Sequence, residues 1–482
     1  MTDPYDIAAP VIYDLVLRSR RTVLPDGERP AAVAVAGERI AVIGGYDEPI
    51  PAHRTEDLGD LVLMPGLVDT HVHVNEPGRT EWEGFATATR AAAAGGVTTI
   101  VDMPLNSLPP TVDTAALAAK RAAAEDQLWV DTGFWGGAVP GNDPDRKALH
   151  DAGVFGFKCF TAPSGVDEFP PLDAAGLHRA CATVAALGAL LLVHAEDPAH
   201  LHDTPPTAQI DGSQASPRAH IEDSQASPRA HIDGLQASPK GDFDRFLATR
   251  PPEAETSAIR EVIAAARATG ARVHILHLAA AEALADIAAA RRDGVRITAE
   301  TCPHYLTLAA ERVPAGATAF KCCPPIRGEA NREALWEGLL NGRIDIVVSD
   351  HSPSPPGMKT GDFATAWGGI ASLQLGLPVM WTEAHGRGLA PADLARWMST
   401  GPADLVGLER KGRIQTGADA DLVAFDPEHA WTVRAADLLH RHPVTPYDGA
   451  TLTGKVVSTW LRGAPVDTEA APRGRRLRRS PR

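Results

Sequence analysis

Eight short apolar runs recur through the centre of the chain, and alanine-rich, helix-like segments separate several of them. Eight strands that alternate with helices are the pattern of a (β/α)8 barrel, and residues 61–350 are close to the usual length of that fold. We therefore predict an α/β protein with a TIM-type barrel. The expected strands are LVLMPGLVDTHVH, GVTTIVDM, LWVDTGFW, VFGFKCF, ALLLVHAE, RVHILHLA, VRITAETC and IDIVVSD.

The two ends of the chain differ from the centre in their sequence pattern. Short alternating apolar stretches, punctuated by glycine, proline and aspartate, occur before residue 63 and again after residue 400. This pattern is typical of antiparallel strands. We predict that residues 1–63 and 400–470 form one small β-sandwich domain and that residues 64–399 form the barrel.

Two segments fit neither part. An eleven-residue unit occurs three times over residues 209–241, and each copy contains proline and serine but too few large apolar residues to bury a face. We expect a mobile surface loop inserted into the barrel, with a binding role as the alternative. The basic run of residues 471–482 is expected to be a disordered tail.

The overall charge and composition exclude several classes of partner. The formal net charge is -15, which disfavours nucleic acid and anionic membranes. No apolar run approaches the about 20 residues of a membrane helix. The start of the chain lacks the features of a secretory signal, and the five cysteines form no CxxC pair. We expect a cytoplasmic protein.

The segment DTHVH ends the first predicted strand. Residues i and i+2 of a strand face the same side, so His71 and His73 should point together into the barrel mouth. Two converging imidazoles suit zinc or a similar divalent metal. An HxH pair alone is only moderately specific, because two polar residues that merely line a barrel would give the same pattern.

Four further residues with metal-binding chemistry end other predicted strands. They are Lys158 in the fourth run, His194 in the fifth, His277 in the sixth and Asp350 in the eighth. Active sites of TIM barrels are built at the C-terminal ends of the strands. We therefore predict that these side chains meet the HxH pair at one metal site.

Lys158 is unusual because an ammonium group inside an apolar strand is costly to bury and repels metal ions. A carbamate, formed when CO2 adds to the amine, would instead be an anion with two oxygens able to bridge two cations. The alternative is an ammonium group paired with Asp350 or another acid. The spacing of the residues leaves both interpretations open.

Other histidines are assigned supporting roles. His274 lies three residues before His277, so it is expected on the opposite face of its strand, packed between barrel and helices. His304 and His351 are expected to support the site rather than to bind metal.

In their order along the chain, these motifs resemble those of the cyclic amidohydrolases, a family that includes dihydroorotases, hydantoinases (dihydropyrimidinases) and allantoinases. The resemblance covers nearly the whole chain and implies a binuclear metal centre with a carboxylated lysine. It implies that His71, His73 and Asp350 hold one metal, that His194 and His277 hold the other, and that carboxylated Lys158 bridges them. The matching segments are MPGLVDTHVH, GFKCF, LLVHAED, HILHLAA and SDHSP.

Within the family, several segments look most like those of the allantoinases. Dihydroorotases carry an arginine just after HxH that receives a substrate carboxylate, whereas this chain has Val74 and then Asn75. Allantoin carries a neutral ureido group, which does not require that cation. The segments that look like allantoinase segments are NEPGRTEWEGF, DMPLNSLPPT, DTGFWGG, KCCPPIR and AWGGI.

The resemblance implies hydrolytic opening of the hydantoin ring of allantoin to allantoate, with Asp350 moving the proton. The side chain of Asn106 and the backbone near Cys323 and Gly368 are expected to orient the ring amides. Cys323 stands where the family often has serine, a change that a backbone contact tolerates.

Three other activities remain as alternatives. A hydantoinase or dihydropyrimidinase is the nearest, followed by a dihydroorotase and then by a non-catalytic relative that uses the barrel as a scaffold. Two divalent ions are expected, zinc first, with cobalt, manganese, iron or nickel as alternatives. The family suggests a homotetramer that acts on a small molecule.

Overall fold

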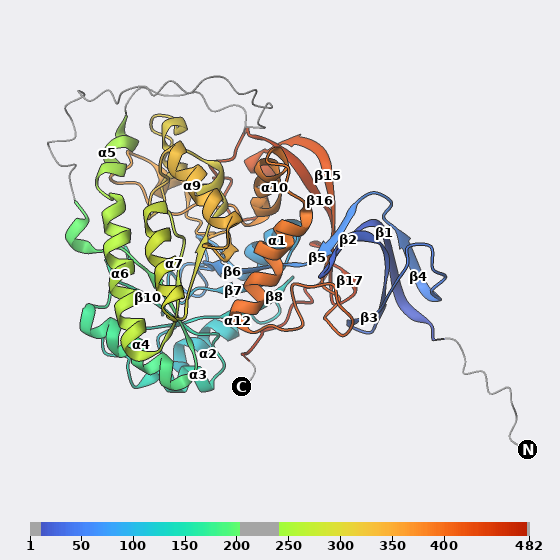
Figure 1. Cartoon of the computed structure of the whole chain (residues 1–482), viewed down its shortest axis with the longest axis horizontal. Coiled ribbons are helices and arrows are strands. Elements are labelled where there is room, and N and C mark those ends of the chain that lie inside the picture. The colour runs from blue at the N-terminus through green and yellow to red at the C-terminus, as the bar shows by residue number, and fades with distance from the viewer. Residues whose placement is uncertain (1–10, 203–240, 480–482) are drawn as a thin grey trace, which may run out of the picture.

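The computed structural model describes residues 11–202 and 241–479. They form a barrel surrounded by helices and a separate β-sheet that projects from one side of it (Figure 1). No helix in the described part of the chain is both long and apolar enough to cross a membrane.

Each of the eight predicted apolar runs supplies a parallel strand of the barrel, and the two-residue strand β9 lies between the third and fourth runs. Hydrogen bonds join β6, β7 and β8 in one group and β9 to β14 in another. A parallel bridge between Val72 and His351 links the first strand to the segment after the last, which closes the ring. The α/β barrel is therefore confirmed. Its strands are β6 (Leu67–Val72), β7 (Val97–Asp102), β8 (Asp131–Phe134), β9 (Gly136–Gly137), β10 (Phe157–Phe160), β11 (Leu190–His194), β12 (Arg272–Ile275), β13 (Ile297–Thr301) and β14 (Ile346–Val347).

The helices pack an apolar face on the strands, as α4 illustrates. The Asp173 carboxylate accepts the N–H of Gly176 at the start of α4, and Gly188 ends the helix with a φ of 63°, a conformation that glycine adopts without strain. Leu177 and Val184 lie on its buried face. The α-helices are α1 (Phe85–Ala94), α2 (Thr114–Ala123), α3 (Asp145–Asp151), α4 (Ala174–Leu187), α5 (Asp242–Ala248), α6 (Pro252–Thr269), α7 (Leu284–Arg292), α8 (Pro303–Thr307), α9 (Glu329–Leu340), α10 (Gly376–Gly386), α11 (Pro391–Ala395) and α12 (Gly401–Val406).

The early and late parts of the chain supply the separate sheet. Its strands run in the order β17-β16-β15-β5-β1-β2-β3, and β4 pairs with β1. Leu17, Val33, Leu422 and Trp460 belong to one apolar core that joins the two contributions. These strands are β1 (Tyr13–Leu24), β2 (Gly27–Ala36), β3 (Arg39–Gly44), β4 (Ala52–Asp57), β5 (Val62–Pro65), β15 (Leu422–Thr432), β16 (Thr451–Leu461) and β17 (Ala464–Pro465).

The C-terminal segment differs from its prediction. Instead of a disordered tail, residues 474–479 bond to the base of the barrel. The Thr132 N–H donates to the Arg475 carbonyl, the Leu477 N–H donates to the Thr132 carbonyl, and the Arg479 N–H donates to the Gly153 carbonyl. Backbone groups make these hydrogen bonds, so the basic side chains of the segment gave no indication of them. Residues 480–482 and the repeats up to residue 240 lie outside the described residues.

A buried charge network joins the barrel to the sheet. The Lys411 ammonium lies 2.8 Å from Asp131 at the start of β8 and 2.7 Å from Asp421 just before β15. Only 4% of the Lys411 side chain is exposed, and Arg462 of the sheet also pairs with Asp131. Loss of this ammonium group would leave Asp421 without an ion-pair partner among the described residues and Asp131 with Arg462 as its remaining cation.

We expect Lys411→Met to lower the free energy of unfolding by about 3–5 kcal/mol, because it removes the ion-pair partner of the buried Asp421 carboxylate and one of the two cations beside Asp131. Urea unfolding followed by circular dichroism measures this. Lys147→Met is the matched control, since it removes an exposed pair with Asp151 and should cost less than about 1 kcal/mol. Equal losses in the two variants would contradict the assignment.

Candidate metal centre

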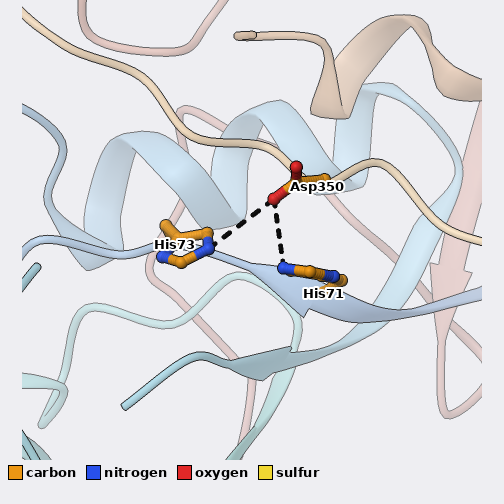
Figure 2. A group of neighbouring side chains, drawn as sticks. All are labelled: His71, His73 and Asp350. Carbon is orange, nitrogen blue, oxygen red and sulfur yellow. Dashed lines mark ion pairs between the residues drawn. The ribbon is translucent and has the colours of Figure 1, made fainter. Parts of the chain in front are cut away.

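Three of the predicted ligands lie together at the C-terminal end of the barrel (Figure 2). Asp350 follows β14, and its Oδ1 atom lies 3.0 Å from His71 Nε2 and 3.6 Å from His73 Nε2. All three residues are buried, and their ligand atoms lie within 4.8 Å of one another. Their chemistry is that of a site for a divalent cation.

The other predicted ligands surround the same point. Lys158 Nζ lies 3.4 Å from His71 Nε2. The ring centre of His277 lies 5.4 Å from that of His71 and 4.6 Å from that of His194. His194 also stacks on Phe160, with ring centres 4.5 Å apart. The structure thus brings all six residues predicted from the sequence into one cluster.

Lys158 lies in a setting that destabilises its charge. The residue is on β10, only 1% exposed, and its ammonium faces the Phe160 ring at 5.0 Å. Burial lowers the pKa of Lys158 to about 8, although Asp350 and Glu300 act in the opposite direction. A larger share of the amine is therefore neutral near pH 7 than in an exposed lysine.

A carboxylate missed by the sequence analysis orients the first histidine. His71 Nδ1 lies 2.5 Å from Glu300 Oε1, which leaves Nε2 facing Asp350. The His277 N–H also donates to Glu300 Oε1, at 3.3 Å. A histidine ligand commonly directs its second nitrogen to such a carboxylate. The available signal was an acidic residue inside the apolar run ITAET on β13.

His274 is placed differently from its prediction. Its Nε2 lies 3.0 Å from Glu300 Oε2 and its Nδ1 lies 2.7 Å from Thr298 Oγ1. His274 is paired with Thr298 in the register of β12 and β13, so both face the side from which Glu300 reaches His71. The expectation that His274 packs between barrel and helices is therefore wrong: the residue holds Glu300 in place.

Asp69 fixes the backbone at the site. Its Oδ1 accepts the N–H of His71 and its Oδ2 accepts the N–H of Ser349, both at 3.0 Å. The carboxylate therefore ties β6 to the residue that precedes Asp350. Burial raises the pKa of Asp69 to about 6.

Three site residues adopt a strained backbone. His277, Asp350 and Asn106 have φ values of 34°, 46° and 73°. A non-glycine residue pays a conformational cost there, and such residues concentrate at functional sites. The strain at His277 and Asp350 arises where each chain segment leaves its strand and turns a side chain into the cluster.

The protonation states suit metal binding. Burial lowers the pKa values of His73 and His277 well below the usual range, so both imidazoles are neutral. Burial raises the pKa of Asp350, but His71 and its neighbours outweigh it, so the carboxylate is ionised. Buried Nδ1 atoms of His73 and His277 have no hydrogen-bond partner among the described residues. Neutral imidazoles and an ionised carboxylate are the forms that ligate cations.

A cavity of about 600 Å³ opens beside the cluster. Asn106, Cys323 and Gly368 line it, as does the indole of Trp367. A Cβ atom added at Gly368 would lie 3.8 Å from Cys323 Sγ, so these two positions are close neighbours in the wall. The volume suits a small heterocycle.

Two lysines that the sequence analysis did not single out hold one wall of this cavity. Lys321 Nζ donates to the carbonyls of Ala364 and Ala366, at 3.1 and 2.6 Å. Lys359 Nζ donates to the carbonyls of Trp367 and Gly369. The loop that carries Gly368 is thereby fixed by two ammonium groups.

The two other histidines near Asp350 do not line the cavity. His351 Nδ1 accepts the N–H groups of Ser372 and Leu373, at 3.1 and 3.3 Å. His304 is fully buried against Tyr305, and neither of its ring nitrogens has a partner among the described residues. It also lies with Cys302 and Asp350 in a second group whose ligand atoms are within 4.8 Å of one another.

The sequence matches the amidohydrolase family over residues 62–466. The chain belongs to this family. It is 54% identical over 472 residues to an allantoinase from Streptomyces avermitilis, which covers 97% of this chain and 99% of that protein. It is 43% identical over 425 residues to an allantoinase from Saccharomyces cerevisiae, with 87% and 85% covered.

Solved structures show the same amidohydrolase fold. An L-hydantoinase (dihydropyrimidinase) from Arthrobacter aurescens superposes with a TM-score of 0.84 at 30% identity, covering 97% of this chain and all of that one. A dihydropyrimidinase from Brevibacillus agri gives 0.81 at 27% identity, covering 96% and 98%. The barrel and the separate sheet therefore recur together in relatives of low identity.

Acid should destabilise the metal-free protein partly through His304, because burial lowers its pKa to about 4. Between pH 6.5 and 4 the unfolded chain binds the proton and the folded chain does not, so the free energy of unfolding falls as the pH falls. We expect His304→Asn to reduce this slope by up to about 1.4 kcal/mol per pH unit.

Urea unfolding at several pH values in the presence of a chelator measures this slope. His178→Asn is the control, since His178 is exposed on α4. Parallel pH profiles for His304→Asn and the unaltered protein would show that His304 is not held neutral.

Proposed function

We propose that this amidohydrolase opens the hydantoin ring of allantoin by hydrolysis and yields allantoate at a two-metal centre. The observation that carries the proposal is the convergence of six ligand-type side chains from five strand ends beside one cavity. The 54% identity to an allantoinase over nearly the full length of both chains supports the choice of ring.

The cavity wall is consistent with a neutral substrate. Val74 and Asn75, the two residues after His73, are buried and uncharged, so no cation follows HxH where dihydroorotases carry an arginine. Three further cationic residues line the cavity: Lys321 is engaged with carbonyl groups, Arg250 pairs with Glu196, and Arg245 is exposed on α5. A hydantoinase is the second candidate because of the structural similarity to the Arthrobacter aurescens enzyme, but at a lower identity of 30%.

The residues present fit two divalent ions. His71, His73 and Asp350 would hold one, and His194 and His277 the other. Zinc is the first choice, with cobalt, manganese, iron or nickel as alternatives that accept the same ligands. When bound, the ions would supply an activated hydroxide and polarise the scissile carbonyl.

Lys158 would bridge the two ions as a carbamate. The neutral amine forms an N–C bond to CO2 and releases one proton, which leaves an anion with two oxygens. Burial supports this step, since the lowered pKa of about 8 increases the share of neutral amine. It also explains how a lysine can lie 3.4 Å from an imidazole of a metal site, where a fixed positive charge would repel cations.

Asp350 is the residue that moves the proton. Its ionised carboxylate accepts a proton from the attacking water and delivers it to the ring nitrogen as the C–N bond breaks. The Asn106 side chain and the backbone at Cys323 and Gly368 orient the ring amides. Phe160 and Trp367 supply aromatic surface to the wall of the cavity.

The enzyme would act as a cytoplasmic homotetramer. Light scattering after size-exclusion chromatography measures this oligomeric state.

The metal-loaded enzyme should hydrolyse allantoin far faster than hydantoin, dihydrouracil or dihydroorotate. Turnover is measured by product formation with each substrate at equal concentration. Asp350→Asn should lower kcat at least 100-fold because it removes the proton acceptor. Preferential turnover of another ring would assign the enzyme a different substrate within the family. Near-normal turnover by Asp350→Asn with both metals bound would show that Asp350 does not move the proton.

Carboxylation of Lys158 should be visible directly. After incubation with 13C-bicarbonate, we expect a carbamate resonance in the 13C NMR spectrum of the enzyme. Lys158→Arg should abolish that resonance, because a guanidinium does not form a stable carbamate. Lys455→Arg, at an exposed lysine of β16, is the control and should retain it. A resonance that persists in Lys158→Arg would place the carbamate elsewhere.

A further inference from the structure

His194 has one ring nitrogen fixed by a buried carboxylate. Its Nε2 lies 2.7 Å from Glu196 Oε2, and the Glu196 side chain is 1% exposed. Thr161 holds the Glu196 backbone, because its hydroxyl donates to the Glu196 carbonyl at 2.8 Å and accepts the Glu196 N–H at 3.1 Å. With Nε2 as the donor to Glu196, the lone pair of His194 is on Nδ1.

A guanidinium group holds the same carboxylate from the other side. Arg250, between α5 and α6, has its Nη1 at 2.5 Å from Glu196 Oε2. The Glu196 carboxylate therefore lies between the imidazole of His194 and the guanidinium of Arg250.

The contacts continue from Arg250 towards the second histidine. The Arg250 carbonyl accepts an N–H from Arg327 at 3.2 Å, and Arg327 pairs with Glu255 at 2.6 Å. Glu255 Oε2 in turn accepts the N–H groups of Ala279 and Ala280, at 2.9 and 3.1 Å. Arg327 and Glu255 are 6% and 2% exposed. The contacts therefore reach the backbone two residues beyond His277.

The remaining ligands depend on different groups. His71 directs its Nδ1 to Glu300, and Asp69 ties the backbone of His71 to that of Ser349. Glu300 contacts residues of both proposed metal positions, since it pairs with His71 and also accepts the N–H of His277. Within the described part of the chain, the hydrogen bonds and ion pairs of Glu196, Arg250, Arg327 and Glu255 do not include His71, His73 or Asp350.

We infer that Glu196, Arg250, Arg327 and Glu255 form a positioning network that sets the affinity of one metal position, the one held by His194 and His277. The inference rests on the proposed two-metal function. It adds the residues that set the affinity of one of the two metal positions. Glu196 selects the tautomer of His194 and holds its ring in place, and Glu255 holds the turn after His277. Such outer carboxylates change metal affinity by about 10–100-fold.

The test is metal binding rather than turnover. The two dissociation constants for zinc are measured on the full-length protein by competition with a chromophoric chelator, and bound metal is counted by mass spectrometry after dialysis. We expect Glu196→Gln to weaken one of the two positions about 10–100-fold and to leave the other unchanged. Arg327→Met, at the far end of the network, should weaken the same position.

Arg260→Met is the matched control, because it removes an exposed pair between Arg260 on α6 and Asp286, and both constants should stay unchanged. Cobalt substitution adds a second readout, since the visible spectrum should lose only one of two components in Glu196→Gln. Circular dichroism reports whether each variant is folded, and the less disruptive Arg250→Lys replaces any variant that is not.

The outcomes separate the inference from the function on which it rests. An unaltered protein that binds fewer than two zinc ions would overturn the two-metal function itself. Two ions in the unaltered protein, with both constants unchanged in Glu196→Gln and Arg327→Met, would overturn the network alone. Equal weakening of both positions would also overturn it, because the effect would then belong to the whole site.

Discussion

The site depends on the burial of one carboxylate, that of Glu300, beneath the histidine cluster. A carboxylate in the barrel interior is stable only when its oxygens are paired. Glu300 achieves this through His71 and His274 and through the backbone N–H of His277. Each contact also fixes the group that donates to Glu300. Pairing this one buried charge therefore sets the direction of the His71 ring and the course of the backbone at His277, just after β12.

The barrel closes around this arrangement by similar means. Asp69 joins β6 to the segment after β14, and the Val72–His351 bridge lies at the same seam. The first and last strands are therefore tied at the point where His71 and Asp350 must meet. The left-handed backbone of Asp350 is tolerated there because the surrounding bonds determine its position.

The sequence was sufficient for the strands and for the six clustered side chains, because both follow from local patterns. Apolar runs of the right length predict strands, and a polar residue at the end of such a run predicts a site. Glu300 and Arg250 could not be assigned in this way, since their partners His71 and Glu196 lie 229 and 54 residues away. Glu196 is only two residues from His194, but β11 ends at His194, so strand geometry does not predict their contact. His274 was misplaced because its spacing from His277 was counted as regular strand, whereas β12 ends at Ile275.

The C-terminal segment has a consequence for the order in which the molecule is completed. The backbone of Thr132 on β8 exchanges hydrogen bonds with Arg475 and Leu477, which lie more than 300 positions later in the sequence. Closing a loop of that length costs conformational entropy, and contacts of such sequence separation form slowly. The backbone of β8 is therefore expected to complete its hydrogen bonds late in folding, after contacts between neighbouring strands have formed.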